Sequence, residues 1–263
     1  REDKSDRIDA ELLARLGRAD PKLLRPIEHR GEQAQRDRAL LRARDGLVRT
    51  RSSLVVQARC IAKSLGMRLP RCDAQNFAKR VIEAGLGGSF PGLETLTAIV
   101  AELSARIREL DRQVEWMCRE RYPETGLLRQ VAGVGPITAL TFVLTIEEPS
   151  RFTRSRDVAA YLGLRPKKRQ SGGSDPELRI SKAGDPYLRR PLIQAAQYIL
   201  GHYGPDTTMR RFGERLAARG GRSARKKAVV AVARKLAVLL HRLWVTKQRY
   251  EPLRGVKPTS VAA

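Results

Sequence analysis

The residues from Arg165 to Ala196 hold the strongest candidate for chemistry in this 263-residue sequence. Ser171 is followed by Gly172 and Gly173, and basic side chains lie on both sides of this turn. Glycines let the backbone approach a ligand closely. Arginines bind phosphate oxygens through two N–H groups and offset the charge that builds up during attack on a phosphate. The pattern predicts a serine nucleophile for a phosphodiester, although a solvated basic loop with a Gly-Gly turn would look the same. The basic residues of this stretch are Arg165, Lys167, Lys168, Arg169, Arg179, Lys182, Arg189 and Arg190.

A serine hydroxyl needs a base or a metal to become an effective nucleophile. No histidine lies near Ser171 in the sequence, so metal assistance is the better expectation, with an ion that polarises the scissile phosphate. Asp6 and Asp9 are candidate ligands, because a spacing of three places both carboxylates on one face of a helix. Mg²⁺ accepts such carboxylates together with phosphate oxygens and water. Two acids alone make a poor site, and acids also favour a helix N-terminus for capping and dipole reasons.

A second candidate for phosphate binding lies in residues 127–144, LLRQVAGVGPITALTFVL. The pattern predicts a helix, a tight turn at Gly133 and Gly135, and a second helix with Pro136 in its first position. Such a turn presents backbone N–H groups where a phosphate can dock. A glycine turn between two helices is also common packing.

The charge balance predicts a polyanionic partner, and we expect double-stranded DNA. The formal net charge is +24, with 52 basic and 28 acidic residues. Residues 129–263 hold 27 Lys/Arg against 9 Asp/Glu, so most of the excess lies in the C-terminal half. Only 5% of residues are aromatic, which argues against a surface that mainly stacks single-stranded bases.

Three scattered cysteines without a CxxC pair and three distant histidines argue against a zinc site and against a disulfide framework. No signal peptide and no bilayer-spanning apolar run is visible, so we expect no membrane partner and a cytoplasmic location. The sequence opens with Arg1 in what reads as the middle of a unit, and we expect an N-terminal segment to be missing.

Hydrophobic periodicity predicts a mainly α-helical chain. Apolar residues at helical spacing indicate a short amphipathic helix over residues 5–18, with Ser5 or Asp6 as N-cap and Gly17 as its stop. Two long helices, over 32–64 and 93–119, flank a shorter one over 73–84. They suit an antiparallel hairpin or a coiled-coil dimer arm, or an ordinary helical bundle. Further helices are expected over 155–162, from Asp185 onward with a kink or break at Pro191, and over 206–218 and 222–247. The last is basic on one side.

Three blocks of the sequence resemble the DEDD-type insertion-sequence transposases, a family that includes the Piv-like DNA invertases. The blocks are KSDRIDAELLAR, LLRQVAGVGPITALTFVLTI and FTRSRDVAAYLGLRPKKRQSGGSDPELRISKAGDPYLRRPLIQAA, in the family's order. The resemblance implies a remnant of an α/β RuvC-like nuclease domain over 1–27 and a helical coiled-coil linker over 28–120. It also implies a compact helical transposase domain with a helix-hairpin-helix-like element over 121–250, and a loose tail over 251–263.

The resemblance also implies roles for single residues. Lys4, Asp6, Arg7, Asp9 and Ala10 match a K-x-D-R-x-D-A motif that supplies the last two of four Mg²⁺-binding acids. Ser171-Gly172-Gly173 match an S-G-G motif whose serine attacks a DNA phosphate and holds the strand as a phosphoserine. A structured bridge RNA that guides recombination, and assembly into a homodimer or homotetramer, are implied as well.

The first two acids of the family lie upstream of its K-x-D-R-x-D-A motif, where this sequence has only five residues before Asp6. Mg²⁺ is therefore expected only if those acids are supplied. Three hypotheses follow: a transposase or site-specific recombinase that cuts and rejoins DNA through Ser171, a truncated DNA- or RNA-binding fragment that cannot cut, and a helical scaffold that only oligomerises. Strong salt dependence of nucleic-acid binding would exclude the scaffold.

Overall fold

The computed structural model describes residues 5–24, 30–171, 173–174, 176 and 178–254. These residues form helices and connecting loops, with no strand among them and only two isolated β-bridges. The predicted mainly α-helical class is therefore confirmed. The predicted α/β remnant at the N-terminus and the coiled-coil character of the long helices stay predictions.

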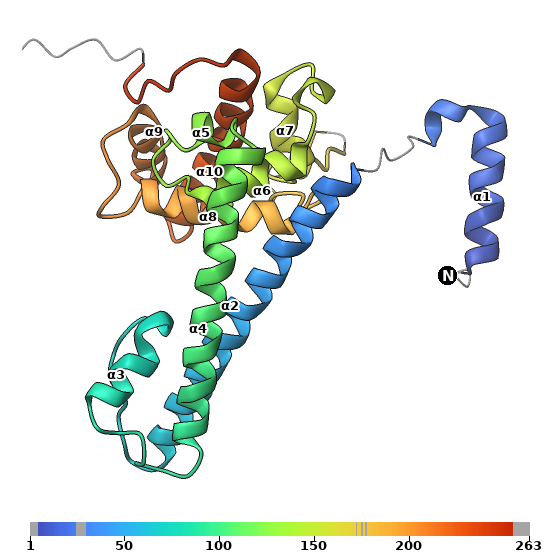
Figure 1. Cartoon of the computed structure of the whole chain (residues 1–263). Coiled ribbons are helices and arrows are strands. Elements are labelled where there is room, and N and C mark those ends of the chain that lie inside the picture. The colour runs from blue at the N-terminus through green and yellow to red at the C-terminus, as the bar shows by residue number, and fades with distance from the viewer. Residues whose placement is uncertain (1–4, 25–29, 172, 175, 177, 255–263) are drawn as a thin grey trace, which may run out of the picture.

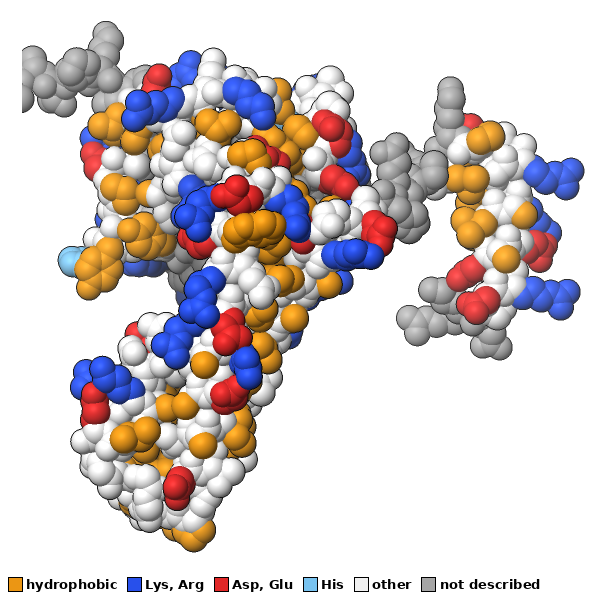
Figure 2. Space-filling view, in the orientation of Figure 1, with side chains coloured by type: hydrophobic (Ala, Val, Ile, Leu, Met, Phe, Trp, Pro, Cys, Tyr) orange, Lys and Arg blue, Asp and Glu red, His pale blue; other side chains and the backbone are white. Residues whose placement is uncertain are grey.

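The first helix, α1 (Asp6–Ala19), begins at Ser5, whose hydroxyl accepts a hydrogen bond from the N–H of Ile8 at 3.4 Å. Gly17 does not stop it, contrary to expectation, since the helix continues to Ala19. No residue of α1 is buried, and its packing partner is the short 3₁₀ turn η1 (Pro21–Leu23). Apolar side chains cover one side of α1 and charged side chains the other (Figure 2). The described part of the chain therefore leaves the apolar side of α1 uncovered.

Two long helices, α2 (Glu32–Ser64) and α4 (Leu93–Trp116), form an antiparallel arm that projects from the body of the molecule (Figure 1). The chain between them holds the 3₁₀ turn η2 (Ala74–Asn76) and α3 (Phe77–Glu83), which pack at the tip of the arm. Phe77, Val81 and Leu93 are fully buried there against Val55 and Ala58 of α2. The tip therefore has a hydrophobic core of its own.

The root of the arm packs against the body. α4 passes into a π-helical turn, η3 (Met117–Arg121), so the helix expected over 93–119 changes its hydrogen-bond pattern near its end. Leu41 of α2 and Met117 of this turn share a core with Leu140 and Leu144 of α6 (Pro136–Ile146). α6 is thus the element of the body onto which the arm packs.

The body consists of short helices around α10 (Ala224–Thr246), which has a face of buried residues from Ala228 to Trp244. Its other elements are α5 (Thr125–Leu128), α6, the 3₁₀ turn η4 (Pro149–Arg151), α7 (Ser155–Tyr161), α8 (Pro186–Ile199) and α9 (Thr208–Ala217). α8 is one helix with Pro191 inside it, so the expected break is absent. A proline removes one ladder hydrogen bond, while burial of Leu188, Leu192 and Ala196 on either side of it holds the helix in the core. None of the described helices is both long and apolar enough to cross a bilayer.

Candidate functional site: a basic hairpin and a glycine turn

Ser171 lies near the tip of a narrow loop that leaves the body after Gly163 and returns at Gly184. The two sides of this loop are joined by backbone hydrogen bonds. The N–H of Ser181 donates to the Arg165 carbonyl at 2.8 Å, and the N–H of Lys167 donates to the Arg179 carbonyl at 2.9 Å. Close to the tip, Ser171 and Ser174 form a second bridge. We call residues 164–183 the serine hairpin. Ser171 itself is exposed.

The base of the serine hairpin is closed by direct backbone packing. Gly163 has φ +66°, and a Cβ on it would lie 2.6 Å from the Ala183 nitrogen. A Cβ on Gly184 would collide with the Tyr161 carbonyl oxygen. Lys182, between them, also has a positive φ of 57°, and its N–H donates to the Gly163 carbonyl at 3.0 Å. Because Gly163 and Gly184 have no Cβ, the backbone segments at the two ends of the hairpin can pack directly against each other. This packing fixes the base of the hairpin.

The structure brings most of the predicted phosphate-binding cations together on this hairpin. All six of them that precede α8 have exposed side chains, and Gly173 is exposed as well. Gly172 lies outside the described residues. The exposed cations are Arg165, Lys167, Lys168, Arg169, Arg179 and Lys182.

Arg189 and Arg190, on the first turns of α8, have partners within the protein. Arg189 donates through Nη1 to the carbonyls of Leu162 at 3.0 Å and Gly184 at 3.3 Å, which ties α8 to the hairpin base. Arg190 makes a two-pronged contact with Asp45 of α2, at 3.1 and 3.3 Å. Arg189 thus connects α8 to the base of the hairpin, and Arg190 connects α8 to α2 of the arm. Their predicted binding of nucleic acid stays a prediction.

The glycine turn lies elsewhere on the body, between α5 and α6. α5 is a single helical turn, so the first helix of the predicted pair is shorter than the sequence indicated. Gly133 has φ +81°, and a Cβ there would lie 2.9 Å from the Ala195 carbonyl oxygen of α8. Gly135 is the N-cap of α6, with Pro136 in the first helical position as predicted. Gly133 is therefore required for the close packing of the turn against α8, in addition to any role in binding phosphate.

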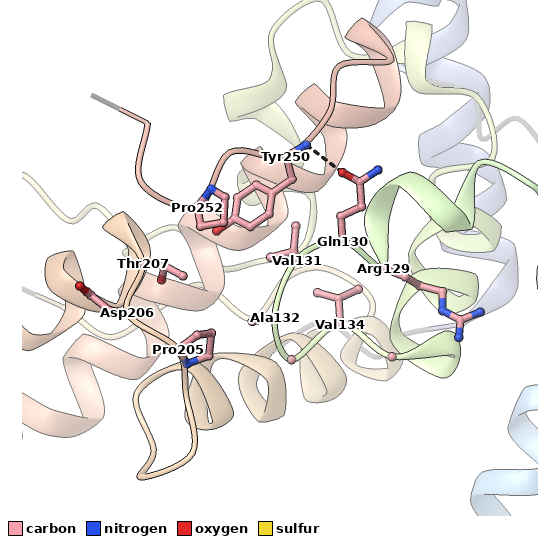
Figure 3. Close-up of a pocket in the computed structure, with 12 residues that line it drawn as sticks. Arg129, Gln130, Val131, Ala132, Val134, Pro205, Asp206, Thr207, Tyr250 and Pro252 are labelled. Carbon is pink, nitrogen blue, oxygen red and sulfur yellow. Dashed lines mark hydrogen bonds between the residues drawn. The ribbon is translucent and has the colours of Figure 1, made fainter. Parts of the chain in front are cut away.

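A hollow of about 570 Å³ opens beside this turn. Its walls are the turn itself, the segment that precedes α9 and the segment that follows α10 (Figure 3). The Tyr250 N–H donates to the Gln130 side chain at 2.9 Å, which joins two of these walls. Burial raises the pKa of the Tyr250 phenol, so this ring stays neutral at ordinary pH. Asp206, at the rim, is engaged by Arg211 at 2.5 Å, and that contact lowers the pKa of its carboxyl group. The hollow thus offers backbone and apolar atoms rather than a free carboxylate.

Asp6 and Asp9 lie in the first turn of α1, both exposed. α1 is well separated from α7 and the body in Figure 1, so the structure does not bring this acid pair to Ser171. Lys4 lies outside the described residues. No group of three His, Cys, Asp or Glu side chains suited to a metal occurs in the described part of the chain. Two exposed carboxylates supply only part of the six-ligand shell of Mg²⁺, so these residues alone do not complete the predicted site.

Several residues that hold the site together were not anticipated. Asp185 caps α8 by accepting from the Tyr187 N–H at 2.7 Å, and it also pairs with Arg38 of α2 at 2.6 Å. The Tyr187 hydroxyl donates to the Leu41 carbonyl at 2.6 Å. These contacts join the start of α8, directly after the serine hairpin, to the arm. The paired glycines at the hairpin base were visible in the sequence, whereas partners 147 residues apart carried no local signal.

Two family models match this chain. The one described as "Transposase IS116/IS110/IS902 family" matches residues 125–214, which include the glycine turn and the serine hairpin. A transposase model of the DEDD IS110 type matches residues 1–66, which include Asp6, Asp9 and all of α2. Together these ranges cover more than half of the chain.

Individual relatives agree with the family models. The chain is 28% identical over 254 residues to the transposase for insertion sequence element IS1111A of Coxiella burnetii, covering 94% of this chain and 68% of the relative. It is 30% identical over 260 residues to a putative transposase, y4rJ, of Sinorhizobium fredii, covering 90% of this chain and 65% of the relative. A pilin gene-inverting protein of Moraxella lacunata is 28% identical over 141 residues, covering 52% of this chain and 42% of the relative. The chain spans about two thirds of the length of the first two relatives.

Proposed function

Since this chain belongs to the IS116/IS110/IS902 family of transposases, we propose that it takes part in cutting and rejoining DNA through Ser171. The observation that carries the proposal is the serine hairpin. It combines an exposed hydroxyl, a base closed by backbone packing and six exposed cations. A reactive group must be held in place to attack efficiently, and a closed hairpin base supplies that restraint.

The proposed step is a transesterification. Ser171 Oγ forms a bond to a DNA phosphorus, and the bond from that phosphorus to one deoxyribose oxygen breaks. The hydroxyl proton leaves Ser171, and the departing sugar oxygen takes up a proton. The phosphoserine linkage retains the energy of the original ester, so a sugar hydroxyl of another strand can reverse the step and rejoin DNA. Arg165, Lys167 and Lys168 would offset charge on the phosphate oxygens as the bond forms.

Mg²⁺ assistance, a structured guide RNA, a homodimer or homotetramer, and a bacterial cytoplasmic, nucleoid-associated location are part of this proposal. They rest on the resemblance of the sequence to the DEDD-type family. The residues described supply two of the metal-binding acids at most, and we derive no step through the ion.

A second candidate function is binding of DNA or RNA without cleavage. The observation that favours it is the metal site: Asp6 and Asp9 have no third ligand among the described residues and lie apart from Ser171. A chain with the basic hairpin and no complete metal site would hold nucleic acid and leave it uncut.

Covalent trapping tests the two candidates. The protein is incubated with Mg²⁺ and nicked duplex DNA carrying the termini of its insertion sequence, and denaturing gels detect a protein–DNA adduct. Under the first proposal, Ser171→Ala removes the adduct and Ser174→Ala retains it, because Ser174 is an exposed hydroxyl on the same hairpin. An undiminished adduct in Ser171→Ala removes Ser171 from the mechanism. Binding of DNA without an adduct in any variant supports the second candidate.

A further inference from the structure

The stretch from Arg215 to Tyr250 carries no acidic residue. It spans the end of α9, the turn that follows it and all of α10, and it lies outside both ranges that the family models match. The eleven basic residues of this stretch are Arg215, Arg219, Arg222, Arg225, Lys226, Lys227, Arg234, Lys235, Arg242, Lys247 and Arg249.

The fold places these charges on the surface. α10 buries Ala228, Val232, Leu236 and Leu240 in the core of the body, so cations on this helix must occupy its other faces. The α9–α10 turn is exposed from Ala218 to Ser223, and Gly220 and Gly221 both have positive φ, at 75° and 91°. This turn brings the last residues of α9 beside the first turn of α10. We call five of the exposed cations at this place the basic corner: Arg215, Arg219, Arg222, Arg225 and Lys226.

Within the described part of the chain, no carboxylate balances the charges of the basic corner. None of its five members makes an ion pair with any residue that the structure describes. The nearest acid along the chain, Glu214, is engaged by Arg210 at 2.7 Å. Some exposed arginines elsewhere are paired, as Arg106 is with both Glu102 and Glu109. A surface that concentrates unpaired arginine destabilises itself by repulsion unless a polyanion covers it.

The types of side chain in the basic corner favour a duplex over a single strand as the polyanion. No aromatic side chain belongs to it, and the nearby Phe212 is half-buried with Lys235 Nζ 4.5 Å from its ring centre. Single-strand binders stack unpaired bases mainly on exposed aromatic rings, whereas contacts to the phosphates of a duplex require only cations and N–H groups. In Figure 1, α9 and α7 lie on opposite sides of the body, so the corner is separate from the serine hairpin that follows α7.

We propose that the basic corner binds the phosphodiester backbone of double-stranded DNA without regard to sequence, as a second contact surface apart from the serine hairpin. This inference rests on the proposed function, because it takes DNA as the polyanion. The corner would hold the flank of a duplex by its charge and leave Ser171 free to meet the phosphate that is cut.

The test is the salt dependence of binding by the full chain to a random-sequence DNA duplex and to an RNA duplex of the same sequence. Fluorescence anisotropy is measured from 50 to 300 mM salt for the wild type and for the triple variant Arg219→Ala, Arg222→Ala, Arg225→Ala. Each phosphate contact contributes about 0.9 to the slope of log affinity against log salt. The triple variant should lower that slope by about 2.7 and weaken binding at least about tenfold at 100 mM salt.

Two control proteins make the result specific. The triple replacement of the carboxylate-paired arginines Arg15, Arg36 and Arg106 by alanine removes the same formal charge from α1 and the arm, and it should change the slope by less than one. Arg219→Lys, Arg222→Lys, Arg225→Lys keeps the charge and should keep the slope. Circular dichroism checks that all variants are folded.

Four other outcomes would contradict the inference, each in a different way. A wild-type slope in the alanine triple variant overturns the basic corner and leaves the proposed function intact. Equal losses in the corner and control triples also overturn it, because binding then follows net charge alone. Loss confined to duplex RNA overturns the assignment to DNA. Failure of the wild type to bind any duplex overturns both this inference and the proposed function.

Discussion

Arg38 of the arm and Asp185 at the start of α8 form an ion pair of 2.6 Å whose side chains are only 11% and 18% exposed. The same carboxylate caps α8 by accepting the Tyr187 N–H. Burial is the main reason that the pKa of the Arg38 guanidinium is lowered, with further repulsion from Arg30. This pair therefore links the arm to the helix that follows the serine hairpin.

We expect Arg38→Met to lower the free energy of unfolding by about 3 kcal/mol, because it leaves a largely buried carboxylate without its cation. Asp185→Asn should cost less, since asparagine still caps the helix. A double-mutant cycle measured by urea unfolding should give a coupling energy of at least about 1 kcal/mol. Arg36→Met is the matched control, as Arg36 pairs with Glu32 on the exposed surface of the same helix and should contribute less than about 1 kcal/mol. Additive effects of the two changes at Arg38 and Asp185 would contradict the linkage.

The base of the serine hairpin gives a second prediction. Gly184→Ala forces a Cβ against the Tyr161 carbonyl and Leu162, so either the hairpin or α7 must move. We expect a loss of about 1 to 3 kcal/mol in the free energy of unfolding. Gly173→Ala in the same loop is the control, because a Cβ there meets no atom within 4 Å, and thermal unfolding should leave its stability within about 0.5 kcal/mol of the wild type. Equal stability of the two variants would show that the hairpin base is loose.

Local patterns predicted the elements of this fold well. The absence of proline and the apolar positions from Glu32 to Ser64 predicted a helix that the structure confirms with the same ends. Pro136 after Gly135 marked the start of α6, and Ser5 marked the start of α1. Gly17 failed as a stop, because a glycine inside a helix costs only about 1 kcal/mol, and α1 continues through it to Ala19.

Contacts between residues that lie far apart in the sequence could not be predicted from local patterns. Arg190 reads as one more cation of the basic stretch, and only the fold shows that Asp45 engages it. Ser171 and its neighbouring cations could be proposed from spacing, because they lie on one loop. The position of Asp6 and Asp9 relative to Ser171 could not, since it depends on how α1 packs. The metal-assisted chemistry therefore stays a prediction.

A polar cluster at the arm root predicts sensitivity to alkaline pH. Asp37, a buried residue, accepts hydrogen bonds from Arg121 at 2.7 and 2.8 Å and from the Tyr122 hydroxyl at 2.8 Å. Burial, followed by this hydrogen bond, raises the pKa of the Tyr122 phenol. A raised pKa in the folded state means that stability is complete below the unfolded value of about 10 and is lost as pH rises above it.

We therefore expect the free energy of unfolding to fall between pH 9.5 and about 11, and Tyr122→Phe to make this fall shallower. At pH 7 the same variant should be less stable by about 1 kcal/mol, because Asp37 loses one hydrogen bond. Urea unfolding at a series of pH values measures both effects. Tyr203→Phe, whose ring is 83% exposed, is the control and should retain the wild-type slope. A steeper fall in Tyr122→Phe than in the wild type would contradict the assignment.

The interior of the arm gives the last prediction, which concerns a gain in stability. Thr97 of α4 is 4% exposed, and its hydroxyl oxygen has no hydrogen-bond partner among the residues that the structure describes. A buried hydroxyl without a partner costs about 1 to 3 kcal/mol of desolvation. Thr97→Val replaces that hydroxyl with a methyl group of similar size, so it should raise the free energy of unfolding by about 1 kcal/mol.

Ser104, two turns along the same helix, is the matched control because its hydroxyl is satisfied. It donates to the Val100 carbonyl at 2.8 Å and accepts from Arg51 Nη1 at 3.2 Å. Ser104→Ala should therefore destabilise the arm, because Arg51 Nη1 would lose its acceptor while Nε of the same guanidinium is already buried without a partner among the described residues. Chemical unfolding followed by circular dichroism compares the two variants. If Thr97→Val is less stable than the wild type, the Thr97 hydroxyl must have a hydrogen-bond partner outside the protein, such as a bridging water between α2 and α4.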